Sequence, residues 1–182
     1  MENIFRKNVI RSRQTGFTLV ELLVVISIVG LLAGLMSVAI PKAMEGGKKA
    51  KAKGELNSIV AAVKAYKQEY GRWPGTNSSS DTYFEDEDSK SLLAALGGVS
   101  TNSIAPNPKG VRFLEGASSE GIMLDPWKVK QYLIVVDTDE SNSLNYKNNL
   151  LSISVLAVSF GKDKKQDEDP KKGDDVFSTD LK

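Results

Sequence analysis

An apolar stretch runs from Gly16 to Ile40 and reads GFTLVELLVVISIVGLLAGLMSVAI. Within residues 17–40, Glu21 is the only charged side chain. As a helix rising about 1.5 Å per residue, this segment would be roughly 36 Å long, enough to cross a hydrocarbon core of about 30 Å. An ionised carboxylate inside such a span is unfavourable unless it is paired. The stretch therefore predicts a membrane-spanning helix in which Glu21 needs a partner.

The segment before this span is basic. Its charged residues are Glu2, Arg6, Lys7, Arg11 and Arg13. Because Lys and Arg favour the cytoplasmic side, we expect residues 1–16 to stay in the cytoplasm and the C-terminal part to be exported. A secretory signal peptide has a shorter apolar region with its small residue after it, whereas Gly16 precedes this one. A plain signal anchor remains an alternative.

The composition excludes several classes of function. The 182-residue chain has a formal net charge of +1, so a basic nucleic-acid-binding face is not indicated. It contains no Cys and no His, which excludes disulfides, thiolate nucleophiles, His-based triads and metal sites built on these ligands. The sequence therefore favours a protein that is not an enzyme.

Residues 13–21, RQTGFTLVE, resemble the processing site of type IV prepilins and of the pseudopilins of type II secretion. The shared elements are a basic leader that ends in Gly, then Phe, Thr and Leu, and a Glu at the fifth position after the cut. The resemblance implies that a prepilin peptidase cleaves after Gly16 and methylates the new amino terminus of Phe17. It also implies assembly into a filament from copies of this chain and other pilin-like subunits, on an inner-membrane platform.

The resemblance supplies a partner for Glu21. In a helical bundle, Glu21 of one subunit neutralises the amino group of Phe17 of its neighbour. A buried pair of opposite charges is less costly than two separate buried charges. The alternative is that Glu21 reaches the membrane surface, since it lies near the end of the span.

Helical periodicity continues beyond the apolar stretch. Between Leu56 and Tyr70, apolar residues recur at three- and four-residue spacing, which predicts an amphipathic helix. We expect one long helix from about Phe17 to Tyr70, with a kink at Pro41 and a soft, Gly-containing region up to Gly54. Gly71 and Pro74 predict the end of this helix. We expect Trp73, which lies between them, to be a packing residue.

The second half combines loops, a short helix and strands. We expect a solvated loop over residues 75–88, a short helix over 89–98 that starts at Ser89, and a loop over 99–110. Runs of β-branched and aromatic residues predict strands at 111–115, 131–137 and 150–160, with a long hairpin loop over 137–149.

An Asp-Pro-Trp tripeptide precedes the strongest of these strand predictions. Asp125-Pro126-Trp127 resembles the same tripeptide of pseudopilins. We expect Asp125 to accept local backbone donors as a turn residue and Trp127 to cover the core.

The C-terminal tail carries the candidate metal ligands. Calcium takes six to eight oxygen ligands in flexible geometry, and a polar loop with spaced Asp residues can provide them. Residues 159–178 resemble the tail of the major pseudopilin, which folds around one Ca²⁺. The resemblance implies ligands from the side chains of Asp163, Asp174 and Asp175 and the carbonyl of Phe160, with that of Lys165 also available. Asp167 and Asp169 are spare acids, of which Asp169 is retained as a candidate ligand.

Two alternatives to this calcium site remain. The tail could be an acidic, Lys-rich disordered segment without metal. A weaker second acidic group lies in the hairpin loop at Asp137, Asp139 and Glu140, but it lacks the Gly turn of an EF-hand loop.

These observations predict an α+β, pilin-like fold, with a long N-terminal helix on a small antiparallel sheet of about three strands. The expected divisions are a cleaved leader (1–16), a transmembrane half-helix (17–40), an amphipathic half-helix (41–74) and a periplasmic loop-and-sheet region (75–182). We expect an inner-membrane, single-pass structural subunit of a periplasmic pseudopilus of type II secretion. A type IV pilin or minor pilin (adhesion, motility or DNA uptake) is the first alternative, and a membrane-anchored periplasmic binding or enzymatic domain the second.

Overall fold

The computed structural model describes residues 16–75, 79–100, 104–118, 120–128, 132–170 and 172–180. It divides into two compact units, Met1–Ala43 and Met44–Lys182, which are described separately below. The predicted leader, residues 1–16, lies outside the described part of the chain except for Gly16.

Helix α1, Leu19–Tyr70, is 52 residues long and contributes to both units. It begins two residues later than predicted because Thr18 and Glu21 form a capping box. Oε2 of Glu21 accepts hydrogen bonds from the backbone N and Oγ1 of Thr18, both at 2.8 Å, and the Glu21 N–H donates to Thr18 Oγ1 at 3.2 Å. This reciprocal pattern satisfies donors that a helix N-terminus otherwise leaves open. The helix continues through Pro41 and Gly54, and the soft region between them stays a prediction.

The N-terminal part of α1 is long and apolar enough to cross a membrane. Its most apolar window has a mean hydropathy of 2.7, and none of that window is buried. Large apolar side chains along it are exposed, from 80% for Leu19 down to 48% for Val24. An apolar surface of this size requires a lipid or protein environment to cover it.

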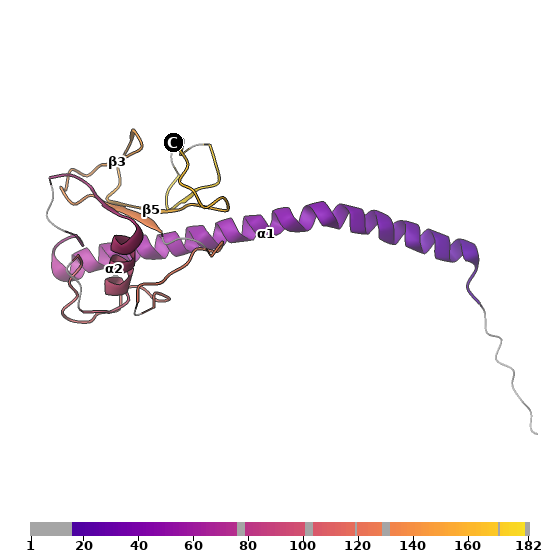
Figure 1. Ribbon diagram of the computed structural model, residues 1–182, viewed down its shortest axis with the longest axis horizontal. Coiled ribbons are helices and arrows are strands. Elements are labelled where there is room, and N and C mark those ends of the chain that lie inside the picture. Colours follow the sequence, from indigo (N-terminus) through magenta and orange to yellow (C-terminus); the bar gives the residue numbers. More distant parts are fainter. Residues whose placement is uncertain are drawn as a thin grey trace, which may run out of the picture. The chain divides into compact units, whose positions relative to one another are not determined.

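The C-terminal part of α1 holds the core of the second unit. Its buried residues are spaced at three and four positions, as the amphipathic pattern predicts: Ala52, Leu56, Ile59, Ala62, Val63 and Tyr66. Figure 1 shows α2 and the sheet gathered around this part of the helix.

The remaining elements form two sheets and a helix. Strands β1 (Thr82–Phe84), β2 (Leu133–Val136), β5 (Val155–Ser159) and β6 (Val176–Phe177) make an antiparallel sheet in the order β1-β2-β5-β6. Strands β3 (Leu144–Tyr146) and β4 (Asn149–Leu151) pair as a separate antiparallel hairpin. Helix α2 runs over Asp86–Leu96.

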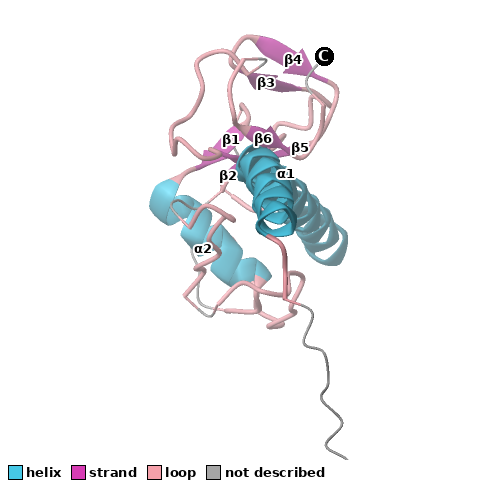
Figure 2. Cartoon of the chain, turned by 90° about the vertical axis from the view of Figure 1, so that its right-hand side faces the viewer, coloured by secondary structure: helices cyan, strands magenta, loops and turns pink. Residues whose placement is uncertain are grey.

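The four-stranded sheet is covered on both faces. Ile134, Val136 and Ala157 belong to the cluster that includes the buried side of α1, whereas Leu133 and Leu156 pack with the β3–β4 hairpin. Figure 2 shows the sheet between α1 and this hairpin. Because alternate side chains of a strand point to opposite faces, both sets must be apolar, and β2 and β5 read as unbroken apolar runs.

Two of the strand predictions need correction. Residues 111–115 are not a strand; the backbone N–H groups of Phe113 and Leu114 donate instead to the carbonyl of Leu96, at 2.8 and 2.9 Å, and close the end of α2. The predicted strand 150–160 is two strands, β4 and β5, separated by a turn at Ser152, where the N–H of Ile153 donates to the carbonyl of Leu151 at 2.9 Å. The prediction for β2 is confirmed, and the predicted hairpin loop contains β3.

The prediction of a loop over residues 75–88 and the predicted start of α2 were also wrong. Residues Thr82–Phe84 form β1, whose partner β2 supplies the ladder that three residues alone could not specify. Helix α2 begins at Asp86, with Glu85 as its N-cap, and not at Ser89. Ser89 is instead buried within the helix, where its hydroxyl donates to the carbonyl of Tyr132.

The predictions for the Asp-Pro-Trp turn and for Trp73 are confirmed. Asp125 Oδ1 accepts the N–H of Trp127 at 3.1 Å, and its Oδ2 accepts the hydroxyl of Ser159 at 2.9 Å. Trp127 lies in the core, and its indole N–H donates to Glu45 Oε1 at 3.0 Å. Trp73 packs on the same core, with Lys67 Nζ 4.1 Å from the ring centroid.

Asn107 lies within residues 99–110, which were predicted to be a loop, and its side chain forms several hydrogen bonds. It is fully buried; its Nδ2 donates to the carbonyls of Ala95 (2.7 Å) and Val111 (2.8 Å). Its Oδ1 accepts from the N–H of Val111 at 3.0 Å and from the hydroxyl of Tyr70. Buried polar groups must be satisfied, so this one side chain ties the loop to both helices.

Replacing Asn107 by alanine is expected to lower the free energy of unfolding by roughly 2–4 kcal/mol, because four hydrogen bonds of buried and part-buried groups are lost together. Chemical denaturation followed by the fluorescence of the two tryptophans measures this. The matched control is Asn145→Ala at an exposed position of β3, which should change the value by less than about 0.5 kcal/mol. Equal effects of the two changes would contradict the role of Asn107.

Candidate functional site

The predicted cleavage point lies on an accessible segment before α1. Gly16, Phe17 and Thr18 precede the first helical residue, and Phe17 is 89% exposed. A side chain added at Gly16 would meet nothing within 4 Å. The fold therefore does not itself require glycine at position 16, and any such requirement must come from a protein that recognises this segment.

Glu21 has a local partner in the uncleaved chain. The capping box with Thr18 engages its carboxylate, so the single subunit does not leave this charge without hydrogen bonds. Thr-x-x-Glu before an apolar run is a recognisable signal for this contact, although the sequence-based prediction placed the partner of Glu21 on another subunit. The pairing of Glu21 with Phe17 of another subunit stays a prediction.

A group of carboxylates gathers in the loop between β5 and β6. Oxygen atoms of Asp163, Asp167 and Asp174 lie within 4.8 Å of one another. Asp174 Oδ2 accepts backbone N–H groups of Lys162 (2.5 Å) and Asp163 (3.1 Å). Asp167 Oδ2 accepts the N–H groups of Asp174 and Asp175, each at 3.0 Å. These bonds hold the loop in a closed turn with three acids facing one another; we call residues 160–175 the acidic loop.

The structure distributes the sequence-predicted ligands differently. Asp163 and Asp174 are in the three-carboxylate group, and Asp167, considered a spare acid, takes the third place. Asp169 lies in an ion pair with Lys172 at 3.3 Å. Phe160 is half-buried and packs beside the β3–β4 hairpin.

Asp175 lies beside this group in a half-buried position. Its Oδ2 accepts the N–H of Asp167 at 3.0 Å, whereas its buried Oδ1 has no hydrogen-bond partner among the described residues. Burial raises the pKa of Asp175 to about 6, and the charges of Asp167 and Asp174 add to the rise. A buried carboxylate oxygen without a donor is costly unless a cation binds it.

Two glycines allow the acidic loop to close this tightly. Gly161 has φ +65°, and a Cβ there would overlap the backbone of Asp174. A Cβ at Gly173 would overlap the carboxylate of Asp167. The loop thus brings three carboxylates together and leaves a fourth with an unsatisfied oxygen. This donor set fits the oxygen coordination of Ca²⁺.

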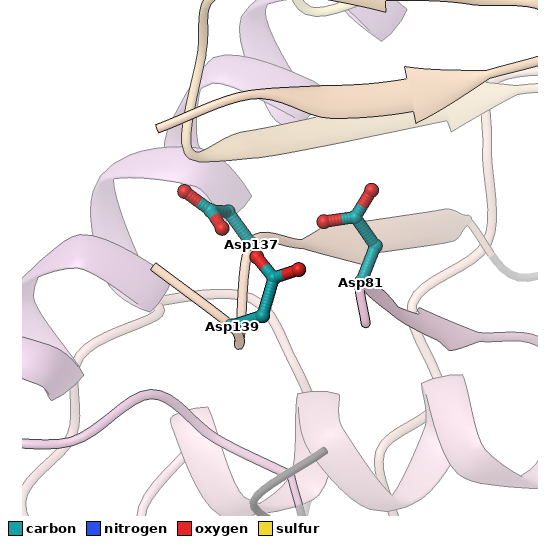
Figure 3. A group of neighbouring side chains, drawn as sticks. All are labelled: Asp81, Asp137 and Asp139. Carbon is teal, nitrogen blue, oxygen red and sulfur yellow. The ribbon is translucent and has the colours of Figure 1, made fainter. Parts of the chain in front are cut away.

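A second acidic group lies where β1 begins and β2 ends. Oxygen atoms of Asp81, Asp137 and Asp139 lie within 4.8 Å of one another (Figure 3). Asp81 replaces Glu140 of the sequence-predicted set, because Glu140 forms an ion pair with Lys67 at 2.7 Å. The sequence missed Asp81 because it is far from the other two along the chain.

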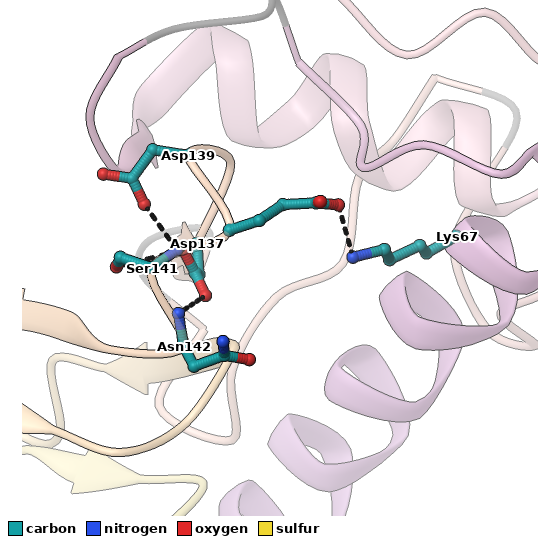
Figure 4. A network of polar contacts seen from close by, with 6 residues as sticks. Lys67, Asp137, Asp139, Ser141 and Asn142 are labelled. Atoms are coloured by element: carbon teal, nitrogen blue, oxygen red, sulfur yellow. Dashed lines mark hydrogen bonds and ion pairs between the residues drawn. The ribbon is translucent and has the colours of Figure 1, made fainter.

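The carboxylate of Asp137 organises the loop after β2. Its Oδ1 accepts the N–H of Ser141 at 3.0 Å and its Oδ2 that of Asn142 at 2.9 Å (Figure 4). Asp139 Oδ1 also accepts from Ser141, at 3.1 Å. Asp137 and Asp139 therefore form a turn in which the backbone supplies the donors, whereas the buried Oδ1 of Asp81 has no hydrogen-bond partner among the described residues.

Replacing Asp139 by asparagine is expected to lower the pKa of Asp137. Burial and the neighbouring Asp139 raise that pKa above its ordinary value of 3.8. A raised pKa means that the folded protein binds this proton more tightly than the unfolded chain. The stability that protonated Asp137 contributes is therefore complete below pH 3.8, and it is lost as the pH rises through the pKa of Asp137 in the folded protein. Asp139→Asn should therefore reduce the amount of stability that is lost over this pH range. NMR titration of the side-chain carboxyl carbon of Asp137 measures its pKa directly.

The control for this titration is Glu140→Gln, which removes a charge already paired with Lys67. It should move the pKa of Asp137 less than Asp139→Asn does. A pKa of Asp137 that is insensitive to Asp139→Asn would contradict the coupling of the two carboxyls.

Comparison with known proteins agrees with the N-terminal features. Residues 11–37 match the family described as "Prokaryotic N-terminal methylation motif". The chain is 32% identical over 120 residues to "Type II secretion system core protein G" of Aeromonas hydrophila, covering 64% of this chain and 70% of that protein. It is 41% identical over 69 residues to the protein of the same name from Pseudomonas aeruginosa, covering 36% of this chain and 46% of that one.

A relative with a different name matches over a segment as long as that of the Pseudomonas aeruginosa protein. The chain is 39% identical over 69 residues to "Fimbrial protein" of Neisseria meningitidis, covering 36% of this chain and 39% of that protein. No solved structure matches the chain significantly. The motif and these relatives fit a membrane-anchored, pilin-like protein.

Proposed function

Since this chain belongs to the family of the type II secretion system core protein G, the major pseudopilin, we propose that it is the structural subunit of a periplasmic pseudopilus. The long apolar helix is the observation that carries this proposal. Its exposed side chains between Leu19 and Ile40 need lipid in the single subunit and other helices in a filament. A structural role also agrees with a chain that lacks His and Cys.

Processing by a prepilin peptidase is the first step of this proposal. The enzyme cuts between Gly16 and Phe17 and methylates the amino group of Phe17. The methylation motif at residues 11–37 and the accessible, non-helical segment before Leu19 support this assignment. The basic residues of the leader favour a cytoplasmic N-terminus, so the second unit would lie in the periplasm.

Assembly is the second step. On an inner-membrane platform, the subunit joins copies of itself and other pilin-like subunits through α1. Cleavage creates a cation at Phe17, four positions before Glu21. Glu21 then exchanges its capping contact for the amino group of a neighbouring subunit, because an amine at membrane depth also requires a counter-charge.

The acidic loop binds Ca²⁺ in this proposal. Asp163, Asp167 and Asp174 supply carboxylate oxygens, and the buried oxygen of Asp175 lies beside them. The ion supplies positive charge that offsets the repulsion among these acids and orders the end of the chain. Binding free energy thereby becomes folding free energy of the second unit.

Mass spectrometry of the mature N-terminus tests the processing step. We expect the first residue to be methylated Phe17, and Gly16→Val to leave the precursor uncut. Gly30→Val is the matched control, because a Cβ at either glycine meets nothing within 4 Å. A mature protein that begins at another residue would exclude the prepilin assignment.

A type IV pilin is the second candidate, favoured by the match to the fimbrial protein. Deletion of the gene separates the two functions. Loss of protein export across the outer membrane, with surface fibres and motility unchanged, supports the pseudopilus; the reverse result supports the pilus. Secretion ATPase and secretin genes next to this gene would also favour secretion.

A further inference from the structure

The tip of the β3–β4 hairpin lies against the acidic loop. Lys147 and Asn148 form a two-residue turn in which both φ angles are positive, +47° and +62°. This turn type matches the natural twist of a hairpin. Asn149 Nδ2 secures it by donating to the carbonyls of Tyr146 (3.3 Å) and Lys147 (2.9 Å). The position from which the Lys147 side chain extends is therefore fixed by local structure.

Two side chains of this tip contact the acidic loop directly. The ammonium of Lys147 donates to the backbone carbonyl of Asp167, and Gln166 Nε2 donates to the hydroxyl of Tyr146 at 2.9 Å. Tyr146 is only 1% exposed, and its ring meets that of Phe177 edge to face, with centroids 6.0 Å apart. Because Tyr146 is already fixed by burial and by these contacts, the neighbouring Lys147 loses little further conformational entropy when it lies beside the loop.

Lys147 is also placed to act electrostatically. Four carboxylates of the acidic loop lie close together, those of Asp163, Asp167, Asp174 and Asp175. Among the described residues of this loop, the cations Lys162, Lys164, Lys165 and Lys172 are exposed. Lys147 is half-buried, and its charge opposes the rise in the pKa of Asp175 that burial causes. A fixed, partly desolvated cation acts more strongly than mobile cations in water.

We propose that Lys147 is an internal counter-ion that holds the acidic loop together without metal and competes with Ca²⁺ for it. This inference rests on the proposed calcium role of the loop. In the metal-free loop, the charge of Lys147 offsets the repulsion among the carboxylates and so stabilises that state. In the metal-bound loop, the same charge repels the ion, so Lys147 stabilises that state less. By thermodynamic linkage, removing Lys147 must then destabilise the metal-free protein most and tighten Ca²⁺ binding.

The test compares the full-length protein in detergent with Lys147→Met and with Lys162→Met, which removes the same charge from an exposed position of the loop. Isothermal titration with CaCl₂ gives the dissociation constant, and tryptophan fluorescence during heating gives the melting temperature in EDTA and in saturating Ca²⁺. We expect Lys147→Met to bind Ca²⁺ roughly fivefold more tightly, from the loss of one nearby positive charge. Its melting temperature should fall in EDTA and recover in Ca²⁺, with smaller changes for Lys162→Met.

The outcomes separate the two claims. If the wild-type protein neither binds Ca²⁺ nor melts higher in its presence, the calcium proposal fails. If the wild type responds but Lys147→Met and Lys162→Met behave alike, or Lys147→Met binds Ca²⁺ more weakly, the counter-ion role is overturned. If the Lys147→Met variant does not fold, Lys147→Gln replaces it, because Gln keeps a donor for the Asp167 carbonyl and removes the charge. Lys147→Gln must then bind Ca²⁺ more tightly than the wild type.

Discussion

We expect Glu21→Ala to abolish filament assembly while membrane insertion and cleavage continue. The apolar stretch remains, so the precursor still inserts, and Gly16 and Phe17 are unchanged for the peptidase. The mature subunit, however, would lack the carboxylate that is proposed to neutralise the amine of its neighbour, and an unpaired cation within the bundle would oppose assembly. Shearing or cross-linking of filaments from cells that produce the variant measures the loss, which we expect to exceed tenfold.

Glu21→Gln decides whether charge or helix capping is responsible. The Gln carbonyl can still accept from the N–H and hydroxyl of Thr18, so the capping box is kept and the charge is removed. If charge pairing drives assembly, Glu21→Gln fails as Glu21→Ala does. Normal filaments from Glu21→Gln would show that Glu21 serves only to start α1.

We expect removal of Ca²⁺ to lower the melting temperature of the second unit by roughly 10 °C. A ligand at a hundred times its dissociation constant adds about 2.7 kcal/mol of stability, which corresponds to this shift in a domain of ordinary size. Both tryptophans, Trp73 and Trp127, lie in the second unit, so their fluorescence follows its unfolding in the full-length protein. Identical melting curves in Ca²⁺ and EDTA would refute the calcium proposal.

Two single substitutions distinguish the alternative ligand sets. Asp167→Asn should remove most of the Ca²⁺-dependent shift, because Asp167 belongs to the three-carboxylate group. Asp169→Asn changes the same type of side chain in an ion pair with Lys172 and should keep the shift. The reverse result would favour the set that the sequence suggested, with Asp169 as a ligand.

Only some of the proposed calcium ligands could be predicted from the sequence. Spaced Asp residues after a strand indicated an acidic loop, and Asp163 and Asp174 do lie together. The place of Asp167 could not be read from spacing, because it depends on how the backbone turns at Gly161 and Gly173. The same holds for Asp81, which joins Asp137 only because β1 pairs with β2.

The fold shows the same division. Helix α1 and the strand β2 were predictable, since periodic or unbroken apolar runs decide local structure through burial. Strand β1 is three residues long and exists only through its ladder to β2, so no local pattern identified it. Asn107 lay in a loop with no distinguishing sequence signal, because the three residues that share its four hydrogen bonds meet only in the folded chain.

Short-range chemistry was thus sufficient for the processing and membrane features of this protein. A cleavage motif, an apolar span and a capping box each consist of neighbouring residues, and their physical effects do not depend on the rest of the chain. The acidic loop is different, because Lys147 and Asp167 meet through the packing of a hairpin on a loop twenty residues away in the chain. Long-range packing alone placed this cation beside the acids that are proposed to hold calcium.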